Sequence, residues 1–500
     1  MTPLLPGQLV MVDIPGKSLD AETAEFLRAH AIRAVCLFRK NLGSESAIRQ
    51  LTADLRTVMG EGALIGIDQE GGSVIRATSL PQAPAAMALG AIGDETLAEQ
   101  VGAAVARGLR SLGINWNFAP VLDVNNNPAN PVIGERSFGE DPALVTRMAR
   151  AWMRGSLSEG VACCVKHFPG HGDTHVDSHH ALPTVDKSLA ELEALELLPF
   201  RALAAGVAGA ASDLPAPAMM TAHIVYPQID PEHPATLSHA LLTNLLRERI
   251  GYQGVIITDA LMMKAVYERY GHAKSAVLAL QAGADMPLAQ GSKAEQAATL
   301  AAIADALAAG ELSEAPLRQA RARLDALATA YPAERSDYAA EQRASDDALM
   351  HTVWAQALTA LRGAKPPARK QPLRVITQAS VISDGVSEAG LPASAVAALF
   401  EGFDDVVFVH LPDLRLLQAR DVPRDGRFNV LVSNLRRRYG SAAAEVKLDL
   451  HLALWNPFQV LDLPAPALIS WGYAEGALAA VRAWLHGDLT ATATPPVSLK

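Results

Sequence analysis

The sequence predicts an α/β protein in which a TIM-type (β/α)8 barrel precedes a smaller layered α/β domain. Over the first 330 residues, eight short apolar runs alternate with amphipathic stretches of helical length. Polar and ionisable residues gather at the carboxyl ends of these runs, which share one face in a barrel. A short basic, proline-rich segment at 363–372 then precedes a second alternation of strands and helices.

The eight apolar runs are the expected barrel strands, since parallel strands covered on both faces are continuously hydrophobic. They are Gln8–Ile14, Ala34–Phe38, Ala63–Asp68, Ile114–Val124, Val161–Phe168, Met219–Ile224, Gly254–Ala260 and Ala284–Leu288. Helices are expected at Glu95–Leu112, Pro142–Glu159, Ser188–Ala205, Ser238–Ile250 and Lys264–Ala282. An open doubly wound sheet is the alternative, but eight such units in roughly 300 residues favour the barrel.

The domain organisation follows from the change in composition near residue 330. We expect a barrel catalytic domain over 1–330, then a connector over 331–372 that is helical to Arg362 and ends in the proline-rich linker. The second domain is expected over 373–500. Its strands are predicted at Leu373–Thr377, Val406–Leu411, Asn429–Ser433, Leu448–Leu454 and Ala467–Trp471, and its helices at Ala393–Phe400 and Glu475–Leu485.

Composition excludes several partner classes. The net charge of −10 over 500 residues argues against binding to nucleic acid or to an anionic membrane surface. No run of about 18 apolar residues is present to span a membrane. The first residues show no export signal, so a cytoplasmic protein is expected. Three cysteines, Cys36, Cys163 and Cys164, are too few for a disulfide framework and are expected to be buried small hydrophobic residues.

The most informative segment follows the fifth expected strand. Five histidines, two aspartates and one lysine occupy the sixteen positions Val165–His180. Pro169, Gly170 and Gly172 prevent a helix at its start, so a long polar loop is expected over the barrel mouth. It is interpreted as a metal site, as a solvated histidine-rich loop, or as a catalytic loop in which Asp177 orients and charges His179.

The metal interpretation rests on the spacing of four between His171, His175 and His179. That spacing brings histidines together on a helix, and the loop composition argues against one. A barrel metal site also typically has a His-x-His pair at the end of the first strand, where this chain has Met11-Val12-Asp13. We therefore expect no metal and no other cofactor.

Asp259 supplies the second chemical group, at the end of a continuous apolar run. It is interpreted either as the N-cap of the following helix or as a carboxylate at the barrel mouth. Glycoside cleavage needs such a carboxylate to attack the sugar carbon while another group protonates the leaving oxygen. Asp259 and a histidine acid on one barrel face would meet that requirement.

Longer motifs make the prediction more specific. In chain order they are Gly66–Gly72 (GIDQEGG), Asn117–Val124 (NFAPVLDV), Gly134–Pro142 (GERSFGEDP), Lys166–Gly172 (KHFPGHG) with Asp177-Ser178-His179, and Met220–His223 (MTAH) with Tyr226-Pro227. Together they resemble glycoside hydrolase family 3, in its bacterial β-N-acetylglucosaminidase branch. Asn456-Pro457-Phe458, Trp471-Gly472-Tyr473 and the ending at 495–499 resemble the α/β sandwich domain of longer members.

The resemblance implies a role for each matched residue. Asp259 would be the nucleophile, and His179 the general acid/base polarised by Asp177. The hydroxyl groups of the sugar would be held by Asp68, Arg76, Arg136, Lys166 and His167. The sequence departs from the family pattern at Ser73, where arginine is usual after the glycine pair, and at Ala260, where a second aspartate usually follows the nucleophile.

The implied function is that of a retaining exo-β-N-acetylglucosaminidase acting on peptidoglycan-derived fragments or short chitooligosaccharides. A small carbohydrate is the expected partner, and the sequence does not fix the oligomeric state. Two alternatives stay open. A histidine acid/base does not repel phosphate as a carboxylate would, so a phosphorylase is possible on the same site. The barrel could also be a sugar-binding protein without turnover.

Overall fold

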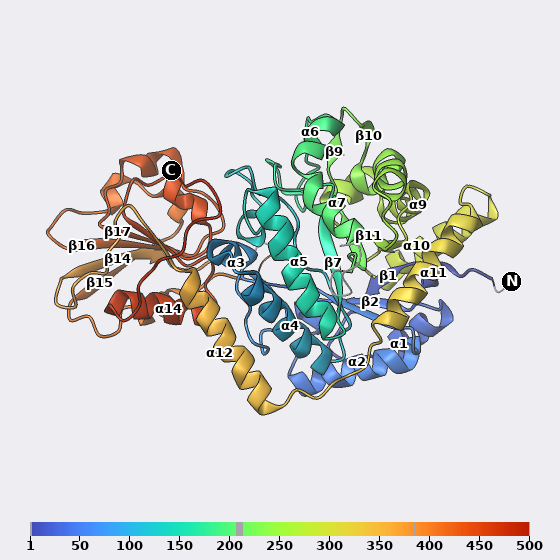
Figure 1. Ribbon diagram of the computed structural model, residues 1–500, viewed down its shortest axis with the longest axis horizontal. Helices are drawn as coiled ribbons and strands as arrows, with labels where there is room; N and C mark the ends of the chain where they lie inside the picture. Colours follow the sequence, from blue (N-terminus) through green and yellow to red (C-terminus); the bar gives the residue numbers. More distant parts are fainter. Residues whose placement is uncertain (1–2, 207–213, 384–386, 388, 500) are drawn as a thin grey trace.

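A closed barrel forms the first part of the molecule (Figure 1). The computed structural model describes residues 3–206, 214–383, 387 and 389–499. Eight strands, all paired in parallel, close in the order β1-β12-β11-β8-β7-β6-β3-β2, which confirms the barrel over the open sheet. They are β1 (Met11–Asp13), β2 (Ala34–Leu37), β3 (Leu64–Ile67), β6 (Trp116–Asn117), β7 (Ala162–Phe168), β8 (Ala218–Thr221), β11 (Val255–Ala260) and β12 (Met286–Leu288).

Seven of the barrel strands lie within the apolar runs that predicted them, and β8 starts one residue before its run, at Ala218. Their side chains form one continuous core with the surrounding helices, because a strand covered on both faces must be apolar on both. The three cysteines are fully buried and unpaired in or beside this core, as expected of small hydrophobic residues.

Helices surround the barrel and bury their apolar faces against it. They are α1 (Ala21–Ala29), α2 (Glu45–Met59), α3 (Ala86–Ile92), α4 (Glu95–Ser111), α5 (Pro142–Ser158), α6 (Leu189–Ala194), α7 (Leu197–Ala205), α8 (Lys264–Tyr270), α9 (His272–Ala282), α10 (Lys293–Ala308) and α11 (Glu314–Ala330). Asp141 caps α5 by accepting the N–H of Ala143, and Pro142 begins the helix, as the sequence predicts.

Several expected elements differ in detail. The helix predicted over Ser188–Ala205 is two helices, α6 and α7, and the one over Lys264–Ala282 breaks at Gly271, where φ is +75°. The helix expected over Ser238–Ile250 is a π-helix that covers Ala240–Arg249. The run Ile114–Val124 forms a strand only at Trp116–Asn117, and beyond Pro120, which has no N–H for the ladder, a single bridge pairs Val121 with Lys166.

Two small hairpins lie beyond the carboxyl ends of the barrel strands. The first pairs β4 (Gln69–Gly71) with β5 (Val74–Ile75), and the second pairs β9 (Val225–Tyr226) with β10 (Asp230–Pro234). The first hairpin begins one residue after β3 ends. Its side chains therefore lie over the barrel mouth.

The second domain is a six-stranded sheet in the order β13-β18-β17-β16-β14-β15, parallel except for β13. The strands are β13 (Thr359–Leu361), β14 (Leu373–Gln378), β15 (Val406–Leu411), β16 (Phe428–Ser433), β17 (Leu450–Ala453) and β18 (Ala467–Ile469). The helices are α12 (Ala340–Ala357), α13 (Ala393–Ala398) and α14 (Glu475–His486). The stretch Tyr331–Arg362 was expected to be a helical connector, but it ends in β13, which is already part of this sheet.

The two domains share an apolar cluster. Met87, Ala88 and Ala91 on α3 pack with Trp354 on α12 and Trp471 after β18, and Figure 1 shows α3 beside the second sheet. In the part of the chain that the structure describes, every helix is too short or too polar to cross a bilayer.

Candidate active site

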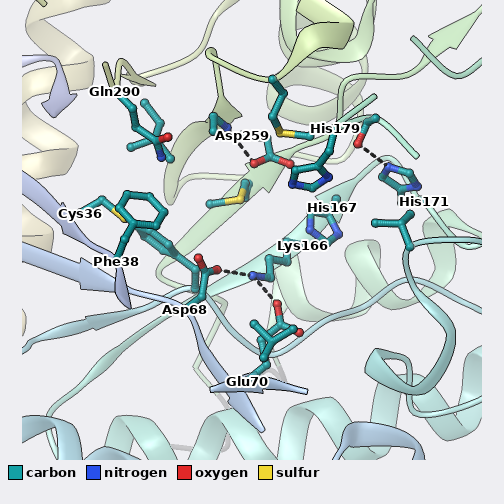
Figure 2. Close-up of a pocket in the computed structure, with 18 of the residues that line it drawn as sticks. Cys36, Phe38, Asp68, Glu70, Lys166, His167, His171, His179, Asp259 and Gln290 are labelled. Carbon is teal, nitrogen blue, oxygen red and sulfur yellow. Dashed lines mark hydrogen bonds and ion pairs between the residues drawn. The ribbon is translucent and has the colours of Figure 1, made fainter. Parts of the chain in front are cut away.

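A cavity of about 290 Å³ opens at the carboxyl ends of the barrel strands (Figure 2). Every residue that the sequence analysis assigned to the site lines this cavity, except Asp177, which contacts its lining residue His179. The assigned lining residues are Asp68, Arg76, Arg136, Lys166, His167, His179 and Asp259. Side chains that are up to 191 residues apart in the sequence thus converge on one small space, as the barrel face predicts.

A buried ion-pair network forms one wall of the cavity. Lys166 Nζ donates to Asp68 Oδ1 at 2.7 Å and lies 2.6 Å from Glu70 Oε1. Arg136 binds both oxygens of Glu70 at 2.8 Å, and Arg76 Nη2 lies 3.9 Å from Asp68. Burial alone would raise the pKa of Glu70, but the charges of Arg136 and Lys166 hold this pKa well below its usual range. The wall is therefore a fixed set of charged donors and acceptors, suited to sugar hydroxyl groups.

His167 is oriented by a carboxylate below it. Its Nδ1 lies 2.6 Å from Asp123 Oδ2, and Asp123 Oδ1 accepts the backbone N–H groups of His167 and His171 at 3.1 and 2.6 Å. Asp123 is fully buried; burial would raise its pKa, but the His167 charge and these hydrogen bonds lower it. An ionised Asp123 can only accept, so Nδ1 of His167 carries a proton and Nε2 is left for the Arg136 side of the cavity.

The loop after β7 places His179 in the cavity wall and leaves His180 outside it, exposed. Asp177 Oδ1 accepts both the backbone N–H of His179, at 2.9 Å, and its ring Nδ1–H, at 2.8 Å. Burial would raise the pKa of Asp177, but the hydrogen bonds and charge of His179 lower it below its ordinary value. His179 therefore presents Nε2 to the cavity, with the Asp177 carboxylate behind the ring.

Asp259 is the second-last residue of β11 and lies beside His179 in Figure 2. Its Oδ1 accepts the N–H of Ala260 at 2.7 Å. Burial would raise the pKa of Asp259, but the charges that His223, His167 and His179 carry in acid lower it, so the carboxylate is ionised at neutral pH. The helix that follows, α8, starts only at Lys264, and its N-cap is Met263, so Asp259 is not the helix cap that was the alternative interpretation.

The three histidines of the metal interpretation contact different groups. Ring nitrogens of His171 face Thr174 and Ser178, and His175 faces Asn127. In residues 3–206, 214–383, 387 and 389–499, no three His, Cys, Asp or Glu side chains are placed to hold a metal ion together. Burial lowers the pKa of His171 to about 4, so this ring is neutral and supports the loop through hydroxyl hydrogen bonds.

Comparison with known families agrees with this geometry. The family model described as "Glycosyl hydrolase family 3 N terminal domain" matches residues 6–327, which is the barrel. The chain belongs to glycoside hydrolase family 3. This family 3 chain is therefore a glycoside hydrolase, which favours an enzyme over a sugar-binding barrel without turnover.

Three related proteins show how far the similarity extends. "Beta-hexosaminidase A" of Pseudoalteromonas piscicida is 37% identical over 346 residues, 63% of this chain, and the match spans 56% of that relative's length. A family 3 β-N-acetylglucosaminidase from Paenibacillus sp. str. FPU-7 is similar over both domains, with 33% identity, a TM-score of 0.86, and coverage of 99% of this chain and 98% of that one. NagZ from Neisseria gonorrhoeae, in complex with N-trifluoroacetyl-D-glucosamine, is 32% identical with a TM-score of 0.56, covering 70% of this chain and 98% of its own.

Three residues of this family 3 site were not assigned from sequence. Glu70 and Asp123 lie within motifs that the sequence analysis quoted, so their position in those motifs was the available signal. Neither was assigned because their roles depend on Arg136, Lys166 and His167, which come from distant segments.

His223 is the third. Its Nε2 lies 3.0 Å from the carbonyl oxygen of Ala260 and its Nδ1 lies 2.8 Å from Thr236 Oγ1. Burial lowers the pKa of His223 below its ordinary value, so the ring is neutral. Because the carbonyl only accepts, Nε2 carries the proton, and His223 holds the carbonyl of Ala260, the residue after Asp259.

Proposed function

We propose that this family 3 enzyme is a retaining exo-β-N-acetylglucosaminidase that removes N-acetylglucosamine from the non-reducing end of its substrate. The observation that carries the proposal is the pair formed by Asp259, an ionised carboxylate, and His179, a histidine backed by Asp177, in one cavity. The β-N-acetylglucosaminidase activity named for the Paenibacillus relative supports the choice of sugar.

In the first step Asp259 attacks the anomeric carbon and forms a covalent glycosyl ester. The bond from that carbon to the leaving oxygen breaks, and this oxygen takes the proton from Nε2 of His179. Asp177 stays ionised behind the ring. It fixes the proton on Nδ1, which leaves Nε2 to transfer the other proton.

In the second step water attacks the same carbon from the side that the leaving group vacated. His179 takes one proton from the water, the ester bond to Asp259 breaks, and the β-configured sugar leaves. A loop rich in glycine, such as the one that carries His179, can move between the two steps to let the leaving group out and water in.

The rest of the cavity is proposed to bind one sugar ring. Asp68, Lys166 and Arg76 form one group of hydroxyl partners; Glu70 with Arg136, and His167, form the others. A volume of about 290 Å³ lies near the lower end of the ~300–1,000 Å³ range of ligand pockets, which suits a single terminal sugar and supports exo action.

For the natural substrate we propose peptidoglycan-derived fragments, or short chitooligosaccharides, and for the site of the reaction the cytoplasm. These proposals rest on the family resemblance, because the cavity is proposed to hold only the terminal sugar. Activity on N-acetylglucosamine linked to a muramic acid, compared with chitobiose, would separate the two substrates. Fractionation of cells that produce the protein would test the location.

Phosphorolysis is a second candidate, favoured by one electrostatic observation. The group beside the incoming nucleophile is His179. Burial would raise the pKa of the neighbouring Asp177, and the positive charge of Arg436 is among the influences that lower it. A phosphate ion would meet less repulsion there than at a carboxylate acid/base. Phosphorolysis would release the sugar 1-phosphate in place of the free sugar.

The test is hydrolysis of 4-nitrophenyl N-acetyl-β-D-glucosaminide compared with the plain β-D-glucoside, with and without phosphate. We expect a strong preference for the N-acetyl sugar and loss of activity in Asp259→Ala and His179→Ala. His180→Ala is the matched control, because this neighbouring histidine lies outside the cavity. Unchanged activity in Asp259→Ala would refute the mechanism, and sugar 1-phosphate formed in phosphate buffer would identify a phosphorylase.

A further inference from the structure

The second domain contacts the barrel close to the sugar-binding wall. The segments after β16 and β17 leave the carboxyl end of the second sheet and contact the barrel segment 125–136, which leaves the carboxyl end of the barrel. Arg436 donates to the carbonyl of Val132, and Arg438 donates to that of Pro128 at 3.3 Å. In proteins with parallel sheets, active sites form at the carboxyl ends of the strands. Here segments from the carboxyl ends of both sheets contact each other.

The central contact of this junction is a hydrogen bond between two buried side chains. Trp455, two residues after the end of β17, donates from Nε1 to Glu135 Oε1 at 2.7 Å. Ser73 Oγ donates to the same oxygen at 2.6 Å. Glu135 is 2% exposed and Trp455 is 1% exposed, so neither exchanges this contact for water. A buried carboxylate depends strongly on its donors, and one of the two comes from the other domain.

Glu135 is directly linked to the cavity. It shares the 3-10 turn η3 (Gly134–Arg136) with Arg136, whose guanidinium binds both oxygens of Glu70 in the cavity wall. In so short a turn the backbone of Arg136 cannot hold its position if Glu135 is displaced.

The same barrel segment also contacts the loop that carries His179. Asn130 donates from Nδ2 to the carbonyls of His171 and Gly172, at 2.8 and 2.9 Å, and Asn127 contacts His175. The segment 125–136 therefore lies between the second domain on one side and the catalytic loop on the other.

We propose that Trp455 is a positioning residue for glycoside cleavage: through Glu135 it holds Arg136 in place against Glu70, so the second domain takes part in building the sugar-binding site. The proposal rests on the proposed function, since it assigns Arg136 to the sugar. Ser73 stands where the family pattern has arginine, so in this chain a neutral hydroxyl and an indole N–H from the second domain are the donors to Glu135.

The first test compares two tryptophan variants of the full-length protein. Trp455→Phe removes the N–H and keeps a ring against Tyr473, whose centroid lies 4.9 Å from that of Trp455. Trp471→Phe is the matched control, because Trp471 is also buried in the second domain and donates its N–H to the carbonyl of Ala357 at 2.7 Å, away from the cavity. The measurements are kcat/KM on the nitrophenyl substrate, the inhibition constant of N-acetylglucosamine, and Tm.

In Trp455→Phe we expect kcat/KM to fall about tenfold and the inhibition constant of N-acetylglucosamine to rise by a similar factor. A tenfold change is at the lower end of the range expected when a hydrogen bond to a charged group is lost. Trp471→Phe is expected to lower Tm comparably and to leave both constants unchanged. If the two variants give the same constants, the positioning role is wrong. A wild-type enzyme with no activity on the N-acetyl sugar would instead refute the proposed function.

A second variant tests the route and covers the case in which Trp455→Phe does not fold. Glu135→Gln removes the charge that the indole N–H binds, so the inhibition constant of N-acetylglucosamine is expected to rise; an unchanged value overturns the proposal. Adding Trp455→Phe to Glu135→Gln is then expected to change little, because both act on one contact. Fully additive effects would show that Trp455 does not act through Glu135.

Discussion

Nδ1 of His179 lies 2.8 Å from Oδ1 of Asp177, and the same oxygen accepts the backbone N–H of His179 at 2.9 Å. One carboxylate oxygen thus holds both the ring and the peptide of the residue two positions later. The pair is complete within three consecutive residues and needs no partner from another segment. The loop can therefore move as a unit without separating the proposed acid/base from the group that polarises it.

This relationship predicts the behaviour of Asp177→Asn. The amide keeps the shape of the carboxyl but not the charge that stabilises the protonated ring, so kcat is expected to fall about 100-fold. The loss should be larger for an alkyl aglycone, which needs protonation to leave, than for 4-nitrophenolate. Equal losses on both aglycones would show that Asp177 does not act through proton transfer.

The acidic limb of the pH–rate profile is expected to lie below pH 3.8, the ordinary pKa of an aspartate. Asp259 attacks only when ionised, and its pKa is lowered because the histidine charges around it outweigh its burial. Activity is thus lost only as pH falls through this lowered pKa. The measurement is kcat/KM in short assays from about pH 3 to about pH 8, with residual activity checked at neutral pH. A reversible acidic inflection near pH 5 would contradict the assignment.

Glu70→Gln is expected to weaken both sugar binding and stability. Glu70 is the shared partner of Arg136 and Lys166, so its loss leaves two buried cations under-paired, at a cost of about 3 kcal/mol. The folded-state pKa of Glu70 is below 4.5, so its stabilising effect is present above pH 4.5 and is lost as pH falls further. The difference in Tm between wild type and variant is therefore expected to shrink in acid.

Glu99→Gln is the control for this prediction, because Glu99 pairs with Arg154 at 2.6 Å on the outside of the barrel, where its side chain is 38% exposed. It is expected to change Tm little at any pH and to leave N-acetylglucosamine binding unchanged. A Glu70→Gln enzyme that bound the sugar as tightly as wild type would exclude this wall from the sugar site.

His223→Phe is expected to lower kcat about 10-fold or more, because a displaced nucleophile loses its alignment with the anomeric carbon. The variant keeps a ring in place but loses the N–H that holds the carbonyl of Ala260. His272→Phe is the matched control: His272 is also buried and contacts a threonine hydroxyl, that of Thr299 at 3.0 Å, away from the cavity. Comparable kcat values in the two variants would refute the role of His223.

The fold could be predicted from the sequence where the signal is local. Each barrel strand is a continuous apolar run, so all eight were predicted near their observed positions. The predictions failed where a single residue or tertiary contact decides: Gly271 divides one expected helix, and Pro120 shortens one expected strand. The strand Thr359–Leu361 has only three residues and was included in the helix before it, because its partner Ala467–Ile469 is about 100 residues away.

The candidate site was predicted as a set of residues but not as a set of contacts. Asp259 and Lys166 were predicted from their positions at strand ends, and His179 from the histidine-rich loop after the fifth strand. The roles of Glu70 and Asp123 depend on which cation or imidazole lies within 3 Å, and only the closed barrel determines that. The contact between Trp455 and Glu135 joins two domains, so no pattern within either segment indicates it.

The apolar cluster that joins α3 to Trp354 and Trp471 has a consequence for how the molecule unfolds. Side chains of both domains form this single buried cluster. Unfolding of either domain would therefore expose apolar side chains of the other domain to water. Heating is therefore expected to melt the enzyme as one cooperative unit, with a single calorimetric peak. Excising the barrel would likewise leave Met87, Ala88 and Ala91 as a bare hydrophobic face, prone to self-association.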